Sequence, residues 1–313
     1  MQQDTIQDQP DSGASPSPSI HPATQIGPAA LTFANLDRSI TFYTDALGLA
    51  LLERNGSRAV LGAGTTPLLL LTEQAGAKPF PGYGATGLYH FAVLVPTRAD
   101  LGRWLRHWLE LGLPMPGQGD HLVSEALYLS DLDGNGIEIY RDRPRAEWTW
   151  EGGRVRMATD PVDIRGLLEL AEAEGQPWEG MPQGTRLGHI HLQVGDIAAA
   201  RRFYHDILGF DVTAQLPGAL FVSAGGYHHH IGLNTWQSRG APPAPEGTAG
   251  LRFYNIELPV AEALAAVVAR LDAAGIPYER SGNAVIARDP FSNRIALRAG
   301  AVTDVAAANA IEG

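Results

Sequence analysis

Histidine and glutamate side chains occur at strand-like spacing in three short segments. In residues 188–194 (GHIHLQV), strict alternation places His189 and His191 on one face of a strand and apolar residues on the other. His90 lies in a similar segment, GLYHFAVLV, and Glu138 lies between two isoleucines in NGIEIY. Two imidazoles and one carboxylate around a metal leave adjacent coordination positions open, which suits non-haem Fe(II) binding substrate and O2 together.

The remaining composition limits the chemistry to His, Asp, Glu and Tyr side chains. None of the 313 residues is cysteine, which excludes disulfides, thiolate zinc sites and cysteine nucleophiles. The 36 glycines form no GxGxxG or Walker pattern before a helix, so no nucleotide cofactor is expected. The formal net charge of -11 argues against binding to nucleic acid or to an anionic membrane, since both need a basic face.

No segment is expected to target or span a membrane. The first 22 residues have neither a basic region nor an apolar core, so they do not resemble a signal peptide. Their Gln, Asp, Ser and Pro content predicts a disordered tail. No apolar run approaches the roughly 18 residues of a membrane-spanning helix. We therefore expect a cytoplasmic protein, and the sequence leaves open whether it forms a homo-oligomer.

A repeated pattern of elements positions the histidines and the glutamate. Residues 26–49 align without a gap with residues 187–210, and each segment reads as an alternating strand, a turn and a helix that stops at Leu-Gly. Weaker copies begin at Gly87 and Gly250, and each continues through a strand, an Asp-rich turn and a final strand. The chain therefore contains four strand-helix-strand-strand-strand modules, at about 26–76, 86–142, 186–238 and 249–299.

The fourfold βαβββ pattern, the helix ends FYTDALGL and FYHDILGF, and the strand DLDGNGIE resemble the vicinal oxygen chelate superfamily. Its members include glyoxalase I, bleomycin-resistance proteins and extradiol dioxygenases, and two of their modules pair into a cup of curved sheet that holds a metal. The resemblance implies an α+β fold with two domains of cup-shaped, mostly antiparallel sheet. We expect a disordered tail (1–25), a first domain of modules one and two (26–142), a linker (143–185), a second domain of modules three and four (186–299) and a C-terminal tail (300–313).

The resemblance also implies which strands bind the metal. The family's ligands lie on the first and last strands of a module, and His90 and Glu138 of module two and His189 of module three match these positions. Modules one and four have no metal-binding side chain at the matching places, which hold Pro28, Leu69, Phe253 and Ala296. We therefore expect modules two and three to build one metal cup, and modules one and four to form a structural partner. Classical extradiol enzymes instead use their last two modules.

Further side chains resemble the acid–base and substrate-binding groups of extradiol enzymes. His121 and Tyr128 precede Glu138, as a His and a Tyr precede the ligand Glu in those enzymes. The run GYHHHIGLN resembles the strand that carries their acid–base histidine. Strict alternation along this run favours His230, whereas matching it to the family's single histidine favours His229. The acid–base role therefore stays open between these two residues.

Together these likenesses imply an extradiol ring-cleaving dioxygenase of aromatic hydrocarbon catabolism. Fe(II), with Mn(II) as an alternative, would be held by His90, Glu138 and His189, and the substrates would be a catechol-type aromatic diol and O2. One histidine of the run would take the catechol proton. His121 and Tyr128 would hydrogen-bond the substrate oxygens and hold the ring in place.

Two other activities stay open at this point. A glyoxalase-like isomerase or lyase would use His230 as a fourth ligand, in a closed set that suits Ni or Zn. Against it, the second carboxylate usual at that site is missing and Tyr128 would have no purpose. A hydroquinone-cleaving dioxygenase is not separable from a catechol-cleaving one by sequence. A binding protein without catalysis is disfavoured, because such members typically lack the ligand residues.

Overall fold

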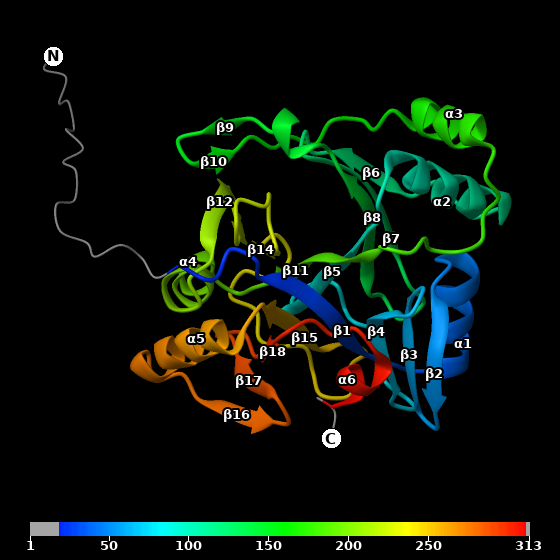
Figure 1. Cartoon of the computed structure of the whole chain (residues 1–313). Coiled ribbons are helices and arrows are strands. Elements are labelled where there is room, and N and C mark those ends of the chain that lie inside the picture. The colour runs from blue at the N-terminus through cyan, green and yellow to red at the C-terminus, as the bar shows by residue number, and fades with distance from the viewer. Residues whose placement is uncertain (1–18, 311–313) are drawn as a thin grey trace, which may run out of the picture.

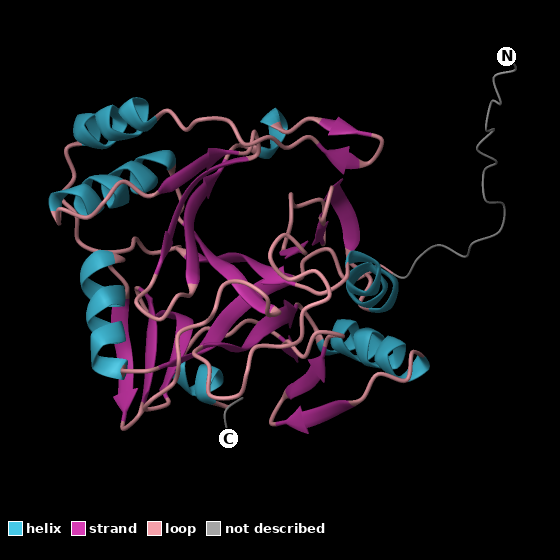
Figure 2. Cartoon of the chain, turned by 180° about the vertical axis from the view of Figure 1, so that it is seen from behind, coloured by secondary structure: helices cyan, strands magenta, loops and turns pink. Residues whose placement is uncertain are grey.

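The computed structural model describes residues 19–310, which form two eight-stranded sheets with most of the helices on their outer sides (Figures 1 and 2). The strand order is β16-β17-β18-β15-β1-β4-β3-β2 in the first sheet and β12-β13-β14-β11-β5-β8-β7-β6 in the second. Each sheet has two parallel strand pairs, and the other neighbours are antiparallel. The predicted α+β fold with mostly antiparallel sheets is confirmed.

Modules one and two each consist of a strand, a helix and three further strands. Module one contains β1 (Gln25–Phe33), α1 (Leu36–Thr41) with the π-helix η1 (Phe42–Ala46), β2 (Ala50–Asn55), β3 (Arg58–Ala63) and β4 (Thr66–Glu73). Module two contains β5 (Gly87–Leu94), α2 (Arg98–Glu110), β6 (Gly117–Asp120), β7 (Ser124–Ser130) and β8 (Gly136–Asp142).

Modules three and four repeat this order. Module three contains β11 (Arg186–Gln193), α4 (Ile197–Arg201) with the π-helix η3 (Arg202–Ile207), β12 (Asp211–Leu216), β13 (Ala219–Ser223) and β14 (Ile231–Asn234). Module four contains β15 (Gly250–Leu258), α5 (Ala261–Ala273), β16 (Tyr278–Ser281), β17 (Ala284–Arg288) and β18 (Arg294–Ala299). The four predicted modules are thus all present.

The sheets combine modules that are distant in the sequence. Modules one and four share the first sheet through the antiparallel pair β1 and β15, and modules two and three share the second through β5 and β11. The predicted pairing of modules two and three is therefore confirmed. The ranges 26–142 and 186–299 stay a prediction as domain limits, since each sheet takes one module from each range.

The Leu-Gly motifs end the helices of modules one and three. Gly48 and Gly209 have φ values of 81° and 90°, which lie in the left-handed region that glycine adopts without strain. The tyrosine of each FY motif bonds the Asp-rich turn of the next module. Tyr43 donates to Asp131 over 2.7 Å and Tyr204 donates to Asp289 over 2.9 Å. These motifs therefore fasten consecutive modules, which lie in different sheets, to each other.

The inner face of the first sheet is closed by apolar side chains. Ala30, Leu70, Phe253 and Ala296 form a buried cluster there, together with residues of the C-terminal helix α6 (Val305–Asn309). Leu70, not the predicted Leu69, takes the place of Glu138. The register explains this correction, because Leu69 pairs with Ala29 and faces the main core, as Ile137 does beside Phe91.

The segments outside the modules are partly ordered. The linker contains the 3-10 helix η2 (Arg145–Glu147), the ribbon β9 (Trp150–Glu151) and β10 (Arg154–Val155), and α3 (Ile164–Glu174). Most of the predicted N-terminal tail (1–25) lies outside the described residues, but Ile20 is buried and its N–H bonds Gly209 O over 2.7 Å. Among residues 19–310, no helix has the length and apolar character needed to cross a bilayer.

Candidate metal centre

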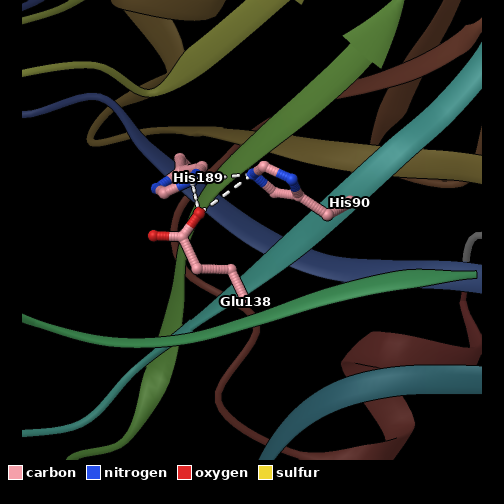
Figure 3. Close-up of side chains that lie close together, drawn as sticks. All are labelled: His90, Glu138 and His189. Atoms are coloured by element: carbon pink, nitrogen blue, oxygen red, sulfur yellow. Dashed lines mark hydrogen bonds and ion pairs between the residues drawn. The ribbon is translucent and has the colours of Figure 1, made fainter. Parts of the chain in front are cut away.

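Side chains from three adjacent strands of the second sheet point toward one place (Figure 3). Glu138 Oε2 lies 3.0 Å from His90 Nε2 and 3.1 Å from His189 Nε2, and the two Nε2 atoms are 3.4 Å apart. All three residues are buried. The structure thus brings together the three residues that the sequence singled out.

The strand register accounts for this convergence. The central strand β5 pairs with β8 in parallel and with β11 antiparallel, and its Ala92 lies opposite both Glu138 and His189. His90 is two residues before Ala92 and therefore faces the same side of the sheet. The isoleucines on either side of Glu138 lie in the main core, as the alternating pattern predicts.

The donor set suits a single small cation. Ligand atoms about 2.1 Å from one ion, at angles near 90°, are about 3 Å from each other. Burial raises the pKa of Glu138, but the neighbouring His189 and His90 outweigh it and hold that pKa well below its usual range. Burial also lowers the pKa of His90 and favours its neutral form. A buried carboxylate anion beside imidazole lone pairs is a set of donors that a cation would satisfy.

His121 and Tyr128 form a hydrogen-bonded pair beside these three residues. His121 Nε2 and the Tyr128 hydroxyl are 2.6 Å apart, and His121 Nδ1 is 2.7 Å from the carbonyl oxygen of Ala158. Because a carbonyl only accepts, Nδ1 carries the proton, and in neutral His121 Nε2 accepts from Tyr128. Burial and the charge of Glu138, which lies directly opposite Tyr128 in the ladder, raise the pKa of Tyr128 well above its usual value.

The three histidines of the GYHHHIGLN run have different surroundings. His229 lines the cavity described next, and its ring centroid is 4.1 Å from that of His189. His230 does not line this cavity, and its Nδ1 accepts the N–H of Ala224 over 3.1 Å. His228 lies 2.8 Å from His229, between the Nδ1 atoms, and 3.0 Å from Asp142, between Nε2 and Oδ1.

A cavity of about 740 Å³ opens over this cluster. His90, His121, Tyr128, Glu138 and His229 all line it. Several other lining residues had no predicted role, among them Tyr89, Met157, His191, Phe221 and Trp236. Alternation did place His191 on the polar face with His189, but Met157 belongs to the linker, which has no periodicity that could place it.

The family model of the Glyoxalase/Bleomycin resistance protein/Dioxygenase superfamily matches residues 25–139 and 186–297. The chain belongs to this superfamily. The match covers both pairs of modules, so the resemblance inferred from the repeat and its motifs is confirmed. The members of this superfamily differ in activity, so the family match alone does not identify the reaction.

One relative is similar over almost the whole chain. The catechol-2,3-dioxygenase of Bacillus subtilis (strain 168) is 48% identical over 278 residues, which cover 88% of this chain and 96% of the relative. The prediction of an enzyme similar to catechol 2,3-dioxygenases is thereby confirmed.

Two solved structures share the fold at low sequence identity. A putative dioxygenase from Bacillus subtilis has a TM-score of 0.59 at 14% identity, covering 91% of this chain and 86% of that protein. Glyoxalase I from Zea mays has a TM-score of 0.52 at 19% identity, covering 88% of this chain and 92% of that protein. These two structures are evidence for the fold alone.

Proposed function

We propose that this enzyme is an extradiol dioxygenase that cleaves a catechol-type aromatic diol with O2. The observation that supports this most directly is the convergence of His90, Glu138 and His189 beneath a cavity that also exposes the pair His121 and Tyr128. The similarity to the Bacillus subtilis catechol-2,3-dioxygenase supports the same activity.

His90 Nε2, His189 Nε2 and Glu138 would hold Fe(II), or Mn(II) as an alternative. When bound, such an ion offers adjacent open positions to the diol and to O2 and allows electron density to pass between them. The three ligands occupy one side, because the sheet carries them all. His90 and Glu138 line the cavity, so substrates would reach the metal site from there.

The side chains around the cavity would bind the diol and move its protons. His229 is our choice for the acid–base residue over His230, because only His229 of the two lines the cavity. It would accept a proton from one hydroxyl of the incoming diol and later return it. Tyr128, backed by His121, would hydrogen-bond a substrate oxygen and fix the orientation of the ring.

The geometry gives less support to a glyoxalase-like reaction. That alternative needs His230 as a fourth ligand, but His230 bonds the backbone of Ala224 and lies outside the cavity lining. A hydroquinone, whose hydroxyls are not adjacent, stays an alternative substrate for the same site. We also propose a cytoplasmic role in aromatic catabolism without nucleic acid or membrane partners, which the net charge of -11 and the lack of cysteine support.

Anaerobic reconstitution with Fe(II), followed by O2 uptake with a panel of catechols and hydroquinones, tests the proposal. We expect uptake with catechols and a yellow ring-opened product. Glu138→Ala and His189→Ala should each lose bound iron. Tyr128→Phe should keep stoichiometric iron and lower kcat by about 10²-fold or more, as for loss of a positioned hydrogen-bonding group in the active site. Stoichiometric iron in Glu138→Ala would refute the ligand assignment.

A further inference from the structure

The described side chains that line the cavity offer no fixed positive charge to an acidic substituent of the substrate. Among the described residues that line it there is no arginine or lysine, and the one acidic side chain is the proposed ligand Glu138. The arginines at the end of β8 have other partners, since Arg141 bonds Glu125 and Arg143 bonds Asp120. Neither of these two guanidinium groups is available as a counter-ion for a substrate carboxylate.

Most of the cavity wall is apolar. Leu129, Ile137, Met157, Leu216, Phe221 and Trp236 contribute to it. Leu216 and Trp236 are 49% and 50% exposed, so part of this apolar wall faces solvent. The volume of about 740 Å³ lies within the roughly 300–1,000 Å³ of pockets that bind drug-sized ligands. A bare catechol ring would leave much of this space empty.

We propose that the substrate is a catechol with an uncharged, apolar substituent, up to the size of a second ring, and that carboxylated catechols are rejected. This inference rests on the proposed function, which concerns the diol, and adds a claim about the substituent on the ring. An apolar group gains from leaving water against this wall. A carboxylate in the same place loses its hydration and finds no cationic partner.

The test compares 3-isopropylcatechol with 2,3-dihydroxybenzoate, whose substituents have similar shape and opposite polarity. With the iron-loaded enzyme we expect kcat/KM to be at least about 100-fold lower for the carboxylate, as for a buried charge left unpaired. Anaerobic calorimetry should show the same order in the dissociation constants. 3-Phenylcatechol should be cleaved at least as efficiently as catechol.

A variant pair tests the role of the cavity wall. Leu216→Arg places a cation at the cavity edge and should raise kcat/KM for 2,3-dihydroxybenzoate about 10-fold. Leu51→Arg, at a position of the other sheet that is 44% exposed, is the matched control and should change nothing. Equal kcat/KM and equal affinity for the two diols would overturn this inference and leave the proposed function standing. If the iron-loaded enzyme consumed no diol, the proposed function would fail. The dissociation constants of the two diols would then still test the inference about the substituent.

A hydrogen-bonded chain behind the cavity wall supports a second, independent inference. His228 links Asp142 to His229 through the two bonds of 3.0 and 2.8 Å. Because an ionised Asp142 only accepts, the proton of neutral His228 is on Nε2, and its bare Nδ1 accepts from His229 Nδ1. Nε2 of His229 is then free of a proton and is the ring nitrogen left for the cavity. Tyr227 donates to the same Asp142 oxygen over 3.1 Å.

We infer that Asp142 and His228 are positioning residues that fix the tautomer of His229, the proposed acid–base residue. Neither residue lines the cavity, so both would act through His229. A hydrogen bond to one ring nitrogen decides which nitrogen carries the proton. In the Asp142→Asn variant, the amide can donate or accept, so this preference is lost.

Side-chain 15N NMR of the full-length protein loaded with diamagnetic Zn(II) tests the tautomer directly. We expect a protonated Nδ1 and a bare Nε2 on His229, and both forms in Asp142→Asn. The iron-loaded Asp142→Asn enzyme should keep its KM and bound iron while kcat falls about 10²-fold. Asp142→Glu should recover part of the rate, and Tyr83→Phe, at an exposed position outside the hydrogen-bonded chain, should stay near the wild-type rate. A protonated Nε2 on native His229, or an unchanged kcat in Asp142→Asn, would overturn the inference.

Discussion

His230 is buried, and its Nδ1 accepts a hydrogen bond from the backbone N–H of Ala224. Burial lowers the pKa of His230 to about 3, whereas an unfolded histidine titrates near about 6.5. Between these values the unfolded chain binds a proton that the native protein does not. The free energy of unfolding therefore falls as the pH drops from about 6.5, by about 2 kcal/mol at pH 5 from this residue.

Urea unfolding of the metal-free protein at pH 7.5 and pH 5 measures this effect. His230→Gln keeps an acceptor for the Ala224 N–H but cannot titrate, so its free energy of unfolding should fall less with acid than that of the wild type. His90, His191 and His229, whose pKa values burial also lowers, contribute equally to both proteins. If both proteins lost the same free energy of unfolding between pH 7.5 and pH 5, the lowered pKa of His230 would not account for the loss.

At the level of elements, removing a Tyr–Asp hydrogen bond between modules should lower the free energy of unfolding without affecting the candidate metal site. Asp131 is buried, its pKa is raised by that burial, and Tyr43 is one of the four groups that donate to its carboxylate. Tyr43→Phe leaves this carboxyl without that partner and should lower the free energy of unfolding by about 1–3 kcal/mol. Tyr204→Phe, at the equivalent bond to Asp289, should have a similar effect. The exposed Tyr83→Phe is the control, and urea unfolding is the measurement. A change in bound iron would show that the bond does more than join modules.

Element periodicity also explains which site residues could be predicted. His90, Glu138 and His189 lie within regular strands, where the two-residue period applies. The choice between His229 and His230 could not be made in this way, because β14 begins only at Ile231 and the run before it is irregular. Strict alternation along the run favoured His230, which does not line the cavity, and the acid–base role stays a prediction. The shift from Leu69 to Leu70 likewise depends on a strand register that spacing did not reveal.

At the scale of the whole molecule, the site joins the two halves of the sequence. His90 and Glu138 come from residues 26–142 and His189 from residues 186–299, across the antiparallel pair β5 and β11. The repeat made the modules predictable, and the distribution of ligands indicated which modules pair. The cavity wall was not predictable, because Met157 comes from the linker and Leu216 from the end of β12. In neither place does a sequence pattern predict which way a side chain points.

Because both halves supply proposed ligands, a bound metal should stabilise the native pairing of the modules. Binding only to the native state raises the free energy of unfolding by about 2.7 kcal/mol when free metal is 100 times its dissociation constant. We expect thermal unfolding under anaerobic conditions to shift upward with Fe(II) concentration and to return on chelation. Glu138→Ala should lose this dependence, whereas Glu110→Ala, an exposed carboxylate on α2, should keep it. An equal shift in Glu138→Ala and the wild type would mean that the stabilising ion binds somewhere other than between β5, β8 and β11.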